Sequence, residues 1–416
     1  MKQMEKTARL IVTVALIVLA STSLSANGLN LNGLGSKAIA MGGAFIGQAD
    51  DYSAIFWNPA GLTQMKNAGF SLFITDLIPS GTYTFPIYGI DAKTKSAMYP
   101  SGALGYFKPI NDKLVIGISA YVPSGTGAKW DGEELKLLSK GAVYKWESFM
   151  AVISVSPVIA YKVSDTFSLG ATLNLDYGMM KIKRPGVGQY TEDLSGFAFG
   201  ATIGALFMPI DRLGVGLTLR TPTKVKFSGD AEMASASAYG LATTSDAERE
   251  ATWPLWLGLG ISFKATDKLT LNADAQYTNW KKIDTIGITY DDAVWQSMKS
   301  HPLLGAAFNN DFVLNWKNAT QLRFGAEYAV SEKLALRAGY YYDPSPSPAE
   351  TLNILLPEVT YNVITAGLGY KAEKLAIDFC LEYLMGKDQE SPLSGKMPGT
   401  HGMSILVPNI AFSYRF

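Results

Sequence analysis

The sequence predicts an all-β fold, a transmembrane β-barrel of fourteen antiparallel strands with an N-terminal hatch inside its lumen. Apolar and polar residues alternate over long stretches, as in 320–330, where Leu322 and Phe324 share one face and Gln321 and Arg323 the other. Six short acidic turns separate such stretches. The chain is 48% hydrophobic and only 17% charged, yet after the N-terminus it has no apolar run of about 20 residues.

The amino-terminal residues 1–26 have the pattern of a secretory signal peptide. A positively charged beginning is supplied by Lys2, Lys6 and Arg9. An apolar stretch at 10–20 and small residues at 21–26 follow, which fits cleavage after Ser25 or Ala26. The apolar stretch is too short to cross a bilayer as a helix, so we expect export rather than anchoring.

The next segment, 27–66, is rich in glycine and lacks strand alternation. Glycine permits the tight turns of a compact segment. An exposed periplasmic tail would leave the apolar side chains of this segment in water, so we expect it to form a hatch in the lumen. The hatch residues that we single out are Asp50, Asp51, Phe56, Asn58, Pro59 and Ala60.

Residues 67–416 are expected to form the barrel. Strands of about 10–14 residues fit tilted bilayer crossings, whereas strands of globular proteins are about half as long. Charges within the strands require a wet lumen, and tyrosines near strand ends fit aromatic girdles. The expected strands are 68–78, 101–109, 114–123, 147–163, 167–180, 196–209, 213–227, 251–264, 269–280, 319–330, 334–342, 362–371, 375–385 and 403–416.

Connections between these strands are short at one end of the barrel and long at the other. The long ones are 79–100, 124–146, 181–195, 228–250, 281–318, 343–361 and 386–402. Short turns are typical of the periplasmic side and long loops of the exterior, so we expect both termini in the periplasm. The chain ends on Phe416, which resembles the terminal signal read by the outer-membrane barrel assembly machinery.

Several classes of function are disfavoured. His301 and His401 fall in expected loops without a nucleophile motif beside them, so we expect no enzyme, and neither a metal nor a cofactor. The net charge of zero gives no basic footprint for nucleic acid. Cys380 is the single cysteine, so no intrachain disulfide is possible. A general porin and a surface receptor stay open, although the hatch argues against an open porin.

Three motifs are similar to those of a known family. They are the run 33–62, the stretch Asp343-Pro344-Ser345-Pro346 after Arg337-Ala338-Gly339, and Tyr277-Thr278-Asn279-Trp280. Over the whole mature chain the sequence resembles the FadL-type (OmpP1/FadL/TodX) outer-membrane transporters. The resemblance implies a monomeric barrel that passively takes up long-chain fatty acids or, in some members, aromatic hydrocarbons. It also implies hatch rearrangement and release towards outer-membrane lipid through a lateral gap at the third strand.

The resemblance favours a long-chain fatty acid as substrate, with an aromatic hydrocarbon as the alternative. Arg184 matches a basic position of the family's inner pocket and would bind a carboxylate; the alternative is a solvated loop charge. Gly117 and Pro123 are the candidates for the lateral gate, since either weakens strand pairing. Each of them equally fits a simple role in packing or in ending the strand.

The expected extracellular loops supply further candidates for substrate binding: Trp130, Leu135, Leu138 and Trp295. Apolar loops on the exterior either pack together or meet an apolar ligand, and we favour mutual packing. The acidic–arginine pair that the family usually carries after the loop proline is replaced by Glu358-Val359-Thr360-Tyr361. This departure bears on the substrate more than on the fold.

Overall fold

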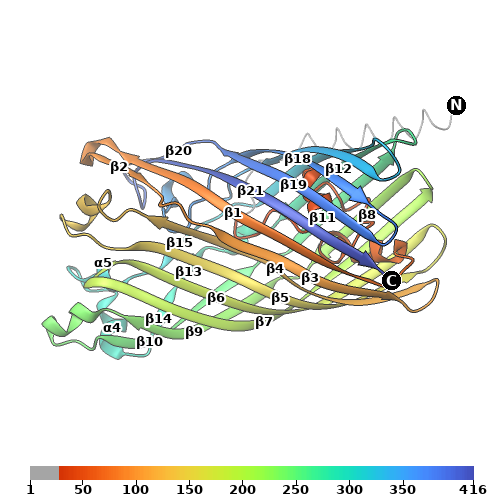
Figure 1. Ribbon diagram of the computed structural model, residues 1–416. Coiled ribbons are helices and arrows are strands. Elements are labelled where there is room, and N and C mark those ends of the chain that lie inside the picture. The colour runs from red at the N-terminus through yellow and green to blue at the C-terminus, as the bar shows by residue number, and fades with distance from the viewer. Residues whose placement is uncertain (1–27) are drawn as a thin grey trace.

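The computed structural model describes residues 28–416. From Gly69 onward the chain forms a closed barrel of fourteen antiparallel strands (Figure 1). Closure joins β1 (Gly69–Phe85) to β21 (Gly399–Arg415), with a register that runs from Gly69 opposite Arg415 to Thr84 opposite Thr400. The fold predicted from the sequence is confirmed. The predicted signal peptide, 1–26, lies outside the described residues.

Neighbouring strands of the wall are also neighbours in the chain. Between β1 and β21 the wall contains β3 (Tyr99–Pro109), β4 (Leu114–Trp130), β5 (Trp146–Lys162), β6 (Phe167–Gly186), β7 (Gly188–Ile210), β8 (Leu213–Arg220) with β9 (Thr223–Glu232), β10 (Thr244–Trp253) with β11 (Trp256–Lys264), β12 (Leu269–Thr278), β16 (Ala319–Ala329), β17 (Leu334–Asp343), β18 (Tyr361–Lys371) and β19 (Leu375–Gly386). Two of the fourteen strands are therefore interrupted: one consists of β8 and β9, the other of β10 and β11. Pro222 and Pro254 lie in the interruptions, where the missing N–H breaks the hydrogen-bonded ladder.

The alternation along each strand separates a lipid face from a lumen face. In β16, Phe324 is 47% exposed on the outside, whereas the adjacent Arg323 is 1% exposed. Apolar side chains of the other wall strands, such as Leu173 and Ile364, are likewise exposed. Such a wall suits hydrocarbon outside and polar groups inside.

The short turns lie at the end of the barrel where the C-terminus is found (Figure 1). Small polar side chains close them. The Asn111 side chain accepts hydrogen bonds from the backbone amides of Lys113 (2.9 Å) and Leu114 (3.0 Å). The Thr266 hydroxyl accepts one from the amide of Leu269 at 3.0 Å. These local bonds replace the ladder bonds that the reversing chain loses.

The opposite end carries the small elements of the long loops. They are η2 (Pro86–Tyr88), β2 (Ile90–Lys93), η3 (Lys136–Ser139), η4 (Ala234–Tyr239), η5 (Trp280–Lys282), β13 (Thr285–Ile286), β14 (Ile288–Tyr290), α4 (Ala293–Met298), α5 (Gly305–Phe308), β15 (Phe312–Val313), η6 (Ala349–Thr351) and β20 (Gln389–Ser391). Across 28–416, every helix is too short or too polar to cross a membrane.

The predicted loop 181–195 is wrong. The ladder of β6 and β7 continues through it, and the two strands are joined at Val187 with Gly186 opposite Gly188. Gly188 has φ +76°, a conformation that glycine adopts without steric penalty. Arg184 therefore lies in a strand and not in a loop. The predicted loop 228–250 is also too long, because β9 and β10 extend to leave 233–243. The sequence analysis expected strands just long enough to cross a bilayer. These strands continue beyond it, so their predicted lengths were too short.

Candidate substrate pathway

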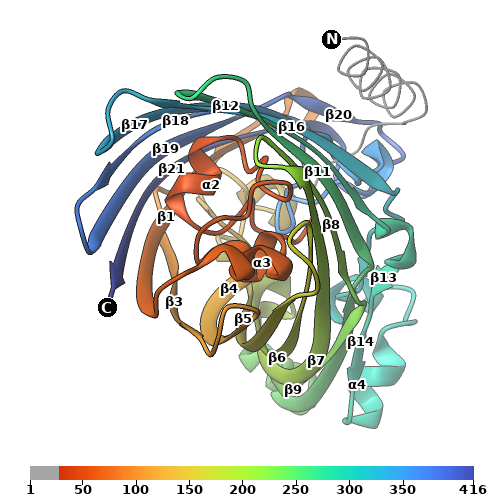
Figure 2. The same cartoon turned by 90° about the vertical axis from the view of Figure 1, so that its right-hand side faces the viewer.

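The hatch, defined here as residues 28–66, lies within the ring of strands (Figure 2). Its helical turns are α2 (Ser36–Ala40), α3 (Ala54–Trp57) and η1 (Pro59–Gln64). Asn58 caps η1, accepting a hydrogen bond from the amide of Ala60 at 3.2 Å. Its amide nitrogen also donates to the carbonyls of Ile46 and Ala205, both at 3.0 Å. Asn58 thus ties two parts of the hatch to the barrel wall.

Buried polar groups of the wall hold the hatch from another side. The Asp274 carboxylate accepts hydrogen bonds from the backbone amides of Phe45 (2.9 Å) and Ile46 (3.0 Å). Gly42 has φ +66°, and a side chain there would meet the carbonyl of Phe324 at 2.9 Å. The glycine-rich sequence is therefore explained by close backbone approach to the wall.

Phe56 contacts a cation of the wall. The guanidinium carbon of Arg220 lies 3.8 Å from the ring centre of Phe56 and 4.3 Å from that of Trp256. Arg220 also donates a hydrogen bond to the carbonyl of Phe56. A desolvated cation beside two aromatic rings stabilises the contact between hatch and wall.

The acidic pair of the hatch belongs to a cluster of charges. Lys37 forms an ion pair with Asp50 at 2.7 Å. Asp51 accepts hydrogen bonds from the amide (2.8 Å) and the hydroxyl (2.6 Å) of Ser53. Burial raises the pKa of Asp51 to about 6, although Lys37 beside it acts in the opposite direction. The Lys37–Asp50 pair joins α2 to the turn that precedes α3.

Some lumen charges on β16, β17 and β19 form ion pairs, and others bond to neutral groups. Arg337 pairs with Glu327 and Asp378, each at 2.6 Å. Arg323, in contrast, donates to the carbonyl of Gly42 at 2.9 Å and to Gln321. Glu382 accepts from the Tyr341 hydroxyl at 2.6 Å.

The third wall strand, β4, changes its partner near Pro123. Its pairing with β3 runs from Val115 to Tyr121, and its register with β5 shifts between Tyr121 and Ser124. Beyond this point the hatch segment 29–31 lies against β4: the amide of Leu31 donates to the carbonyl of Pro123 at 3.1 Å. Of the two gate candidates, Pro123 lies at the irregularity, while Gly117 lies in regular pairing with Phe107.

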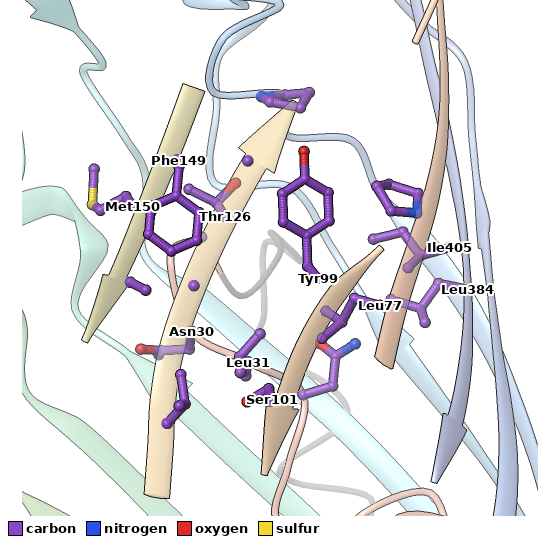
Figure 3. A pocket seen from close by; sticks show the side chains of 18 of the residues that line it. Asn30, Leu31, Leu77, Tyr99, Ser101, Thr126, Phe149, Met150, Leu384 and Ile405 are labelled. Atoms are coloured by element: carbon purple, nitrogen blue, oxygen red, sulfur yellow. The ribbon is translucent and has the colours of Figure 1, made fainter. Parts of the chain in front are cut away.

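A cavity of about 240 Å³ lies beside this part of β4 and segment 29–31 (Figure 3). Its lining comes from the hatch, from β4 and from strands on both sides, and it is mostly apolar. Figure 3 shows Leu31, Leu77, Phe149, Leu384 and Ile405 around it. Lys, Arg and His are absent from its described lining, whereas Asp343 and Glu358 belong to it. The arrangement suits a small apolar molecule.

The four candidates from the expected loops lie elsewhere. The expected loop 124–146 begins too early, because β4 extends to Trp130, which is therefore a strand residue. Trp130, Leu135 and Trp295 are buried in one apolar cluster, and Leu138 packs against it. The indole nitrogen of Trp130 donates to the carbonyl of Ile354 at 2.8 Å, and that of Trp295 to the carbonyl of Ala242 at 2.9 Å. None of the four lines the cavity. The structure therefore agrees with the mutual packing that we favoured.

Arg184 does not line the cavity either. It is half-buried in β6, where its Nε donates to the carbonyl of Pro185 at 3.3 Å.

The residues that the sequence analysis missed are Arg220, Asp274 and Glu358. Arg220 and Asp274 each carried a weak signal, a charge within a strand of alternating pattern. Glu358 carried none beyond its place in the altered motif after the loop proline.

No group of three or more His, Cys, Asp or Glu within 28–416 is arranged to hold a metal ion. The fold and the cavity define a class of protein: a plugged transmembrane β-barrel with a mostly apolar cavity beside β4. Residues 17–395 match the family described as "Outer membrane protein transport protein (OMPP1/FadL/TodX)". The chain belongs to this family, whose members are outer-membrane transporters of hydrophobic compounds.

Relatives and solved structures agree with this assignment. The long-chain fatty acid transport protein of Escherichia coli O6:H1 is 24% identical over 91% of this chain and 90% of its own length. A FadL homologue of Pseudomonas aeruginosa has the same fold, with a TM-score of 0.76 at 19% identity, covering 94% of this chain and all of that one. The toluene transporter TbuX of Ralstonia pickettii gives a TM-score of 0.72 at 20% identity, with 93% and 99% covered.

Proposed function

We propose that this protein takes up small hydrophobic molecules passively through the cavity beside β4. The observation that carries the proposal is the position of this apolar space at the place where β4 exchanges its partner β3 for hatch segment 29–31. An apolar solute needs an apolar path and an exit to lipid, not a water-filled pore. The chain acts on this view as a transporter and not as an enzyme.

The route that we infer has three steps. A hydrophobic molecule enters from the end that carries α4 and α5, and reaches the cavity past the packed loops. It leaves sideways near Pro123, where segment 29–31 fills part of the wall. Movement of the hatch opens this exit. The contacts of Leu31 and Leu29 with β4 support the last step, because short ladders are weaker than the long ones of the wall.

Uptake of oleate and of toluene, by cells or liposomes containing the protein, tests the proposal. Deletion of 27–60 serves as the comparison, since removal of the hatch should admit hydrophilic sugars that the intact protein excludes. We expect the intact protein to pass at least one of the two hydrophobic probes and not the sugars. Equal uptake of sugars by the intact protein would favour the porin alternative.

The substrate is a separate question. The relative from Escherichia coli O6:H1 is a long-chain fatty acid transport protein, and TbuX of Ralstonia pickettii is a toluene transporter. A fatty acid requires a cation near its carboxylate, and Arg184 is our sequence-based candidate. A cavity lining without Lys, Arg or His favours the second candidate, an aromatic hydrocarbon. Arg184→Ala should weaken oleate binding and leave toluene binding unchanged; no effect on either would remove this role.

We further propose that the short turns and the C-terminus face the periplasm and that the protein acts as a monomer. Signal-peptide cleavage would precede insertion into the outer membrane. The last strand would then present Phe416, which is 62% exposed, to the barrel assembly machinery. Loss of outer-membrane insertion after removal of Phe416 would support the assembly role.

A further inference from the structure

Glu358 brings an ionisable group into the cavity beside β4. It follows Pro357 in the loop between β17 and β18, and it lines the cavity while being only 7% exposed. The surrounding loop fixes its position, because Ser345 donates a hydrogen bond to the carbonyl of Glu358 at 3.1 Å. The hydrogen bonds and ion pairs found within 28–416 include none to its carboxylate. Burial of an acidic group without a partner is costly, and a hydrogen-bond donor that reached Glu358 would lower that cost.

A second carboxylate, that of Asp343, lines the same cavity. Asp343 is 3% exposed at the end of β17 and accepts a hydrogen bond from the amide of Gln321 at 2.6 Å. Burial, and then the charge of Asp343, raises the pKa of Glu358 well above its ordinary value. No cationic residue of the lining offsets the pair. This part of the apolar cavity therefore lacks a positive group.

Three kinds of apolar solute differ in how they meet this arrangement. A carboxylate would bring a negative charge to a lining that holds two acidic residues and no cation to pair with it. A pure hydrocarbon would cover Glu358 without giving it a partner, which leaves a polar group desolvated. A protonated amine on an apolar body would donate hydrogen bonds to the acidic side while its body contacts the apolar wall.

We propose that the cavity selects hydrophobic amines over hydrophobic carboxylates, with Glu358 as the residue that binds the ammonium group. This inference rests on the proposed uptake of hydrophobic molecules and deepens it by naming a substrate class. The apolar walls bind the body of the molecule, and Glu358 distinguishes its polar end. The hydroxyl of an alcohol would be intermediate, because it donates a hydrogen bond without a charge.

Binding of three eight-carbon probes to the full-length, detergent-solubilised protein tests the proposal: octylamine, octanol and octanoate. We expect octylamine to bind at least about tenfold more tightly than octanoate, the factor that follows from one charge-assisted hydrogen bond. Glu358→Gln should abolish this preference and leave octanol binding unchanged. Glu350→Gln is the matched control, since Glu350 is an exposed residue of the same loop that does not line the cavity.

The outcomes separate this inference from the proposed function. Octanoate binding as tightly as octylamine to the wild-type protein overturns the selectivity, whether or not the variant folds. An unchanged preference in Glu358→Gln overturns the role of Glu358. Either result leaves hydrophobic uptake in place if oleate or toluene still crosses. Absence of binding for all three probes together with absence of uptake overturns both.

Discussion

The guanidinium carbon of Arg220, in the barrel wall, lies 3.8 Å from the ring centre of Phe56, in the hatch. Trp256 lies near the same guanidinium, at 4.3 Å. The contact joins the hatch to the barrel wall. Any movement of the hatch that displaces α3 must separate Phe56 from Arg220. Arg220 therefore sets part of the free energy needed to open the hatch.

Replacement of Arg220 by Ala should weaken hatch docking by on the order of 3 kcal/mol, since it removes a desolvated cation–π contact and a buried hydrogen bond. Hydrogen exchange of the amides of 54–64 measures the change as lost protection. Arg212→Ala is the control, because Arg212 forms an exposed ion pair with Asp267 at a turn, away from the hatch. Unchanged protection in Arg220→Ala would show that the contact does not hold the hatch.

Asp51 should contribute to the pH dependence of hatch stability. Its pKa of about 6 in the folded protein lies above the ordinary value of about 3.9. The folded state then binds more protons between these values, so hatch stability rises as the pH falls through about 6 and levels off below about 4. We expect Asp51 to contribute a factor of about ten to the protection of hatch amides at about pH 5 relative to about pH 7.5, after correction for intrinsic exchange.

Asp51→Asn isolates this effect. The amide keeps an acceptor for Ser53 but does not titrate, so the ratio of protection at the two pH values should fall by about tenfold. The neighbouring charges of Lys37, Asp50 and Asp378 remain in the variant. A pH dependence of unchanged size in Asp51→Asn would assign it to other groups, such as Asp274, which also holds the hatch.

The loop that carries α4 and α5 should depend on a buried ion pair. Arg249 donates to both carboxylate oxygens of Glu192, at 2.9 and 2.8 Å, and both side chains are fully buried. Arg249 also donates to the carbonyls of Ile286 (3.0 Å) and Asn310 (2.9 Å) in this loop. Removal of Glu192 leaves a buried charge without its partner, which costs about 3–5 kcal/mol.

We expect Glu192→Ala to expose 281–318 to proteases while the barrel stays folded in detergent. Glu248→Ala is the matched control, since Glu248 forms an exposed ion pair with Lys226 on the neighbouring strand. Equal resistance of 281–318 in the Glu192 variant and the wild type would refute a role for this pair in ordering the loop.

Local chemistry explains how much of the fold was predictable. The turn at Asn111 and the alternation around Arg323 depend on residues close in sequence, and both were predicted. The contact of Trp130 with the carbonyl of Ile354 joins residues 224 positions apart, so no local pattern specifies it. Arg184 was placed in a loop because ladder pairing beyond the bilayer lacks the apolar alternation of a lipid-facing strand.

The candidate site was less predictable than the fold for the same reason. The cavity is formed where segment 29–31, β4 and the loop around Glu358 meet, and their sequences are far apart. Pro123 could be singled out because proline weakens strand pairing wherever it occurs. Glu358 could not, because its burial depends on the packing of the whole loop.

The central claim, passage through the cavity beside β4, is tested most directly by filling that cavity. Gly125 lines it, and a side chain there would first meet the carbonyl of Met150 at 3.6 Å, without a clash. Gly287→Trp is the control, in an extramembrane loop where the nearest atom, of Asp311, is also at 3.6 Å. Uptake of whichever probe (oleate, toluene or octylamine) the wild-type protein passes fastest is then compared. We predict that Gly125→Trp reduces uptake to that of protein-free membranes while Gly287→Trp does not; wild-type uptake by a folded Gly125→Trp barrel would contradict the account.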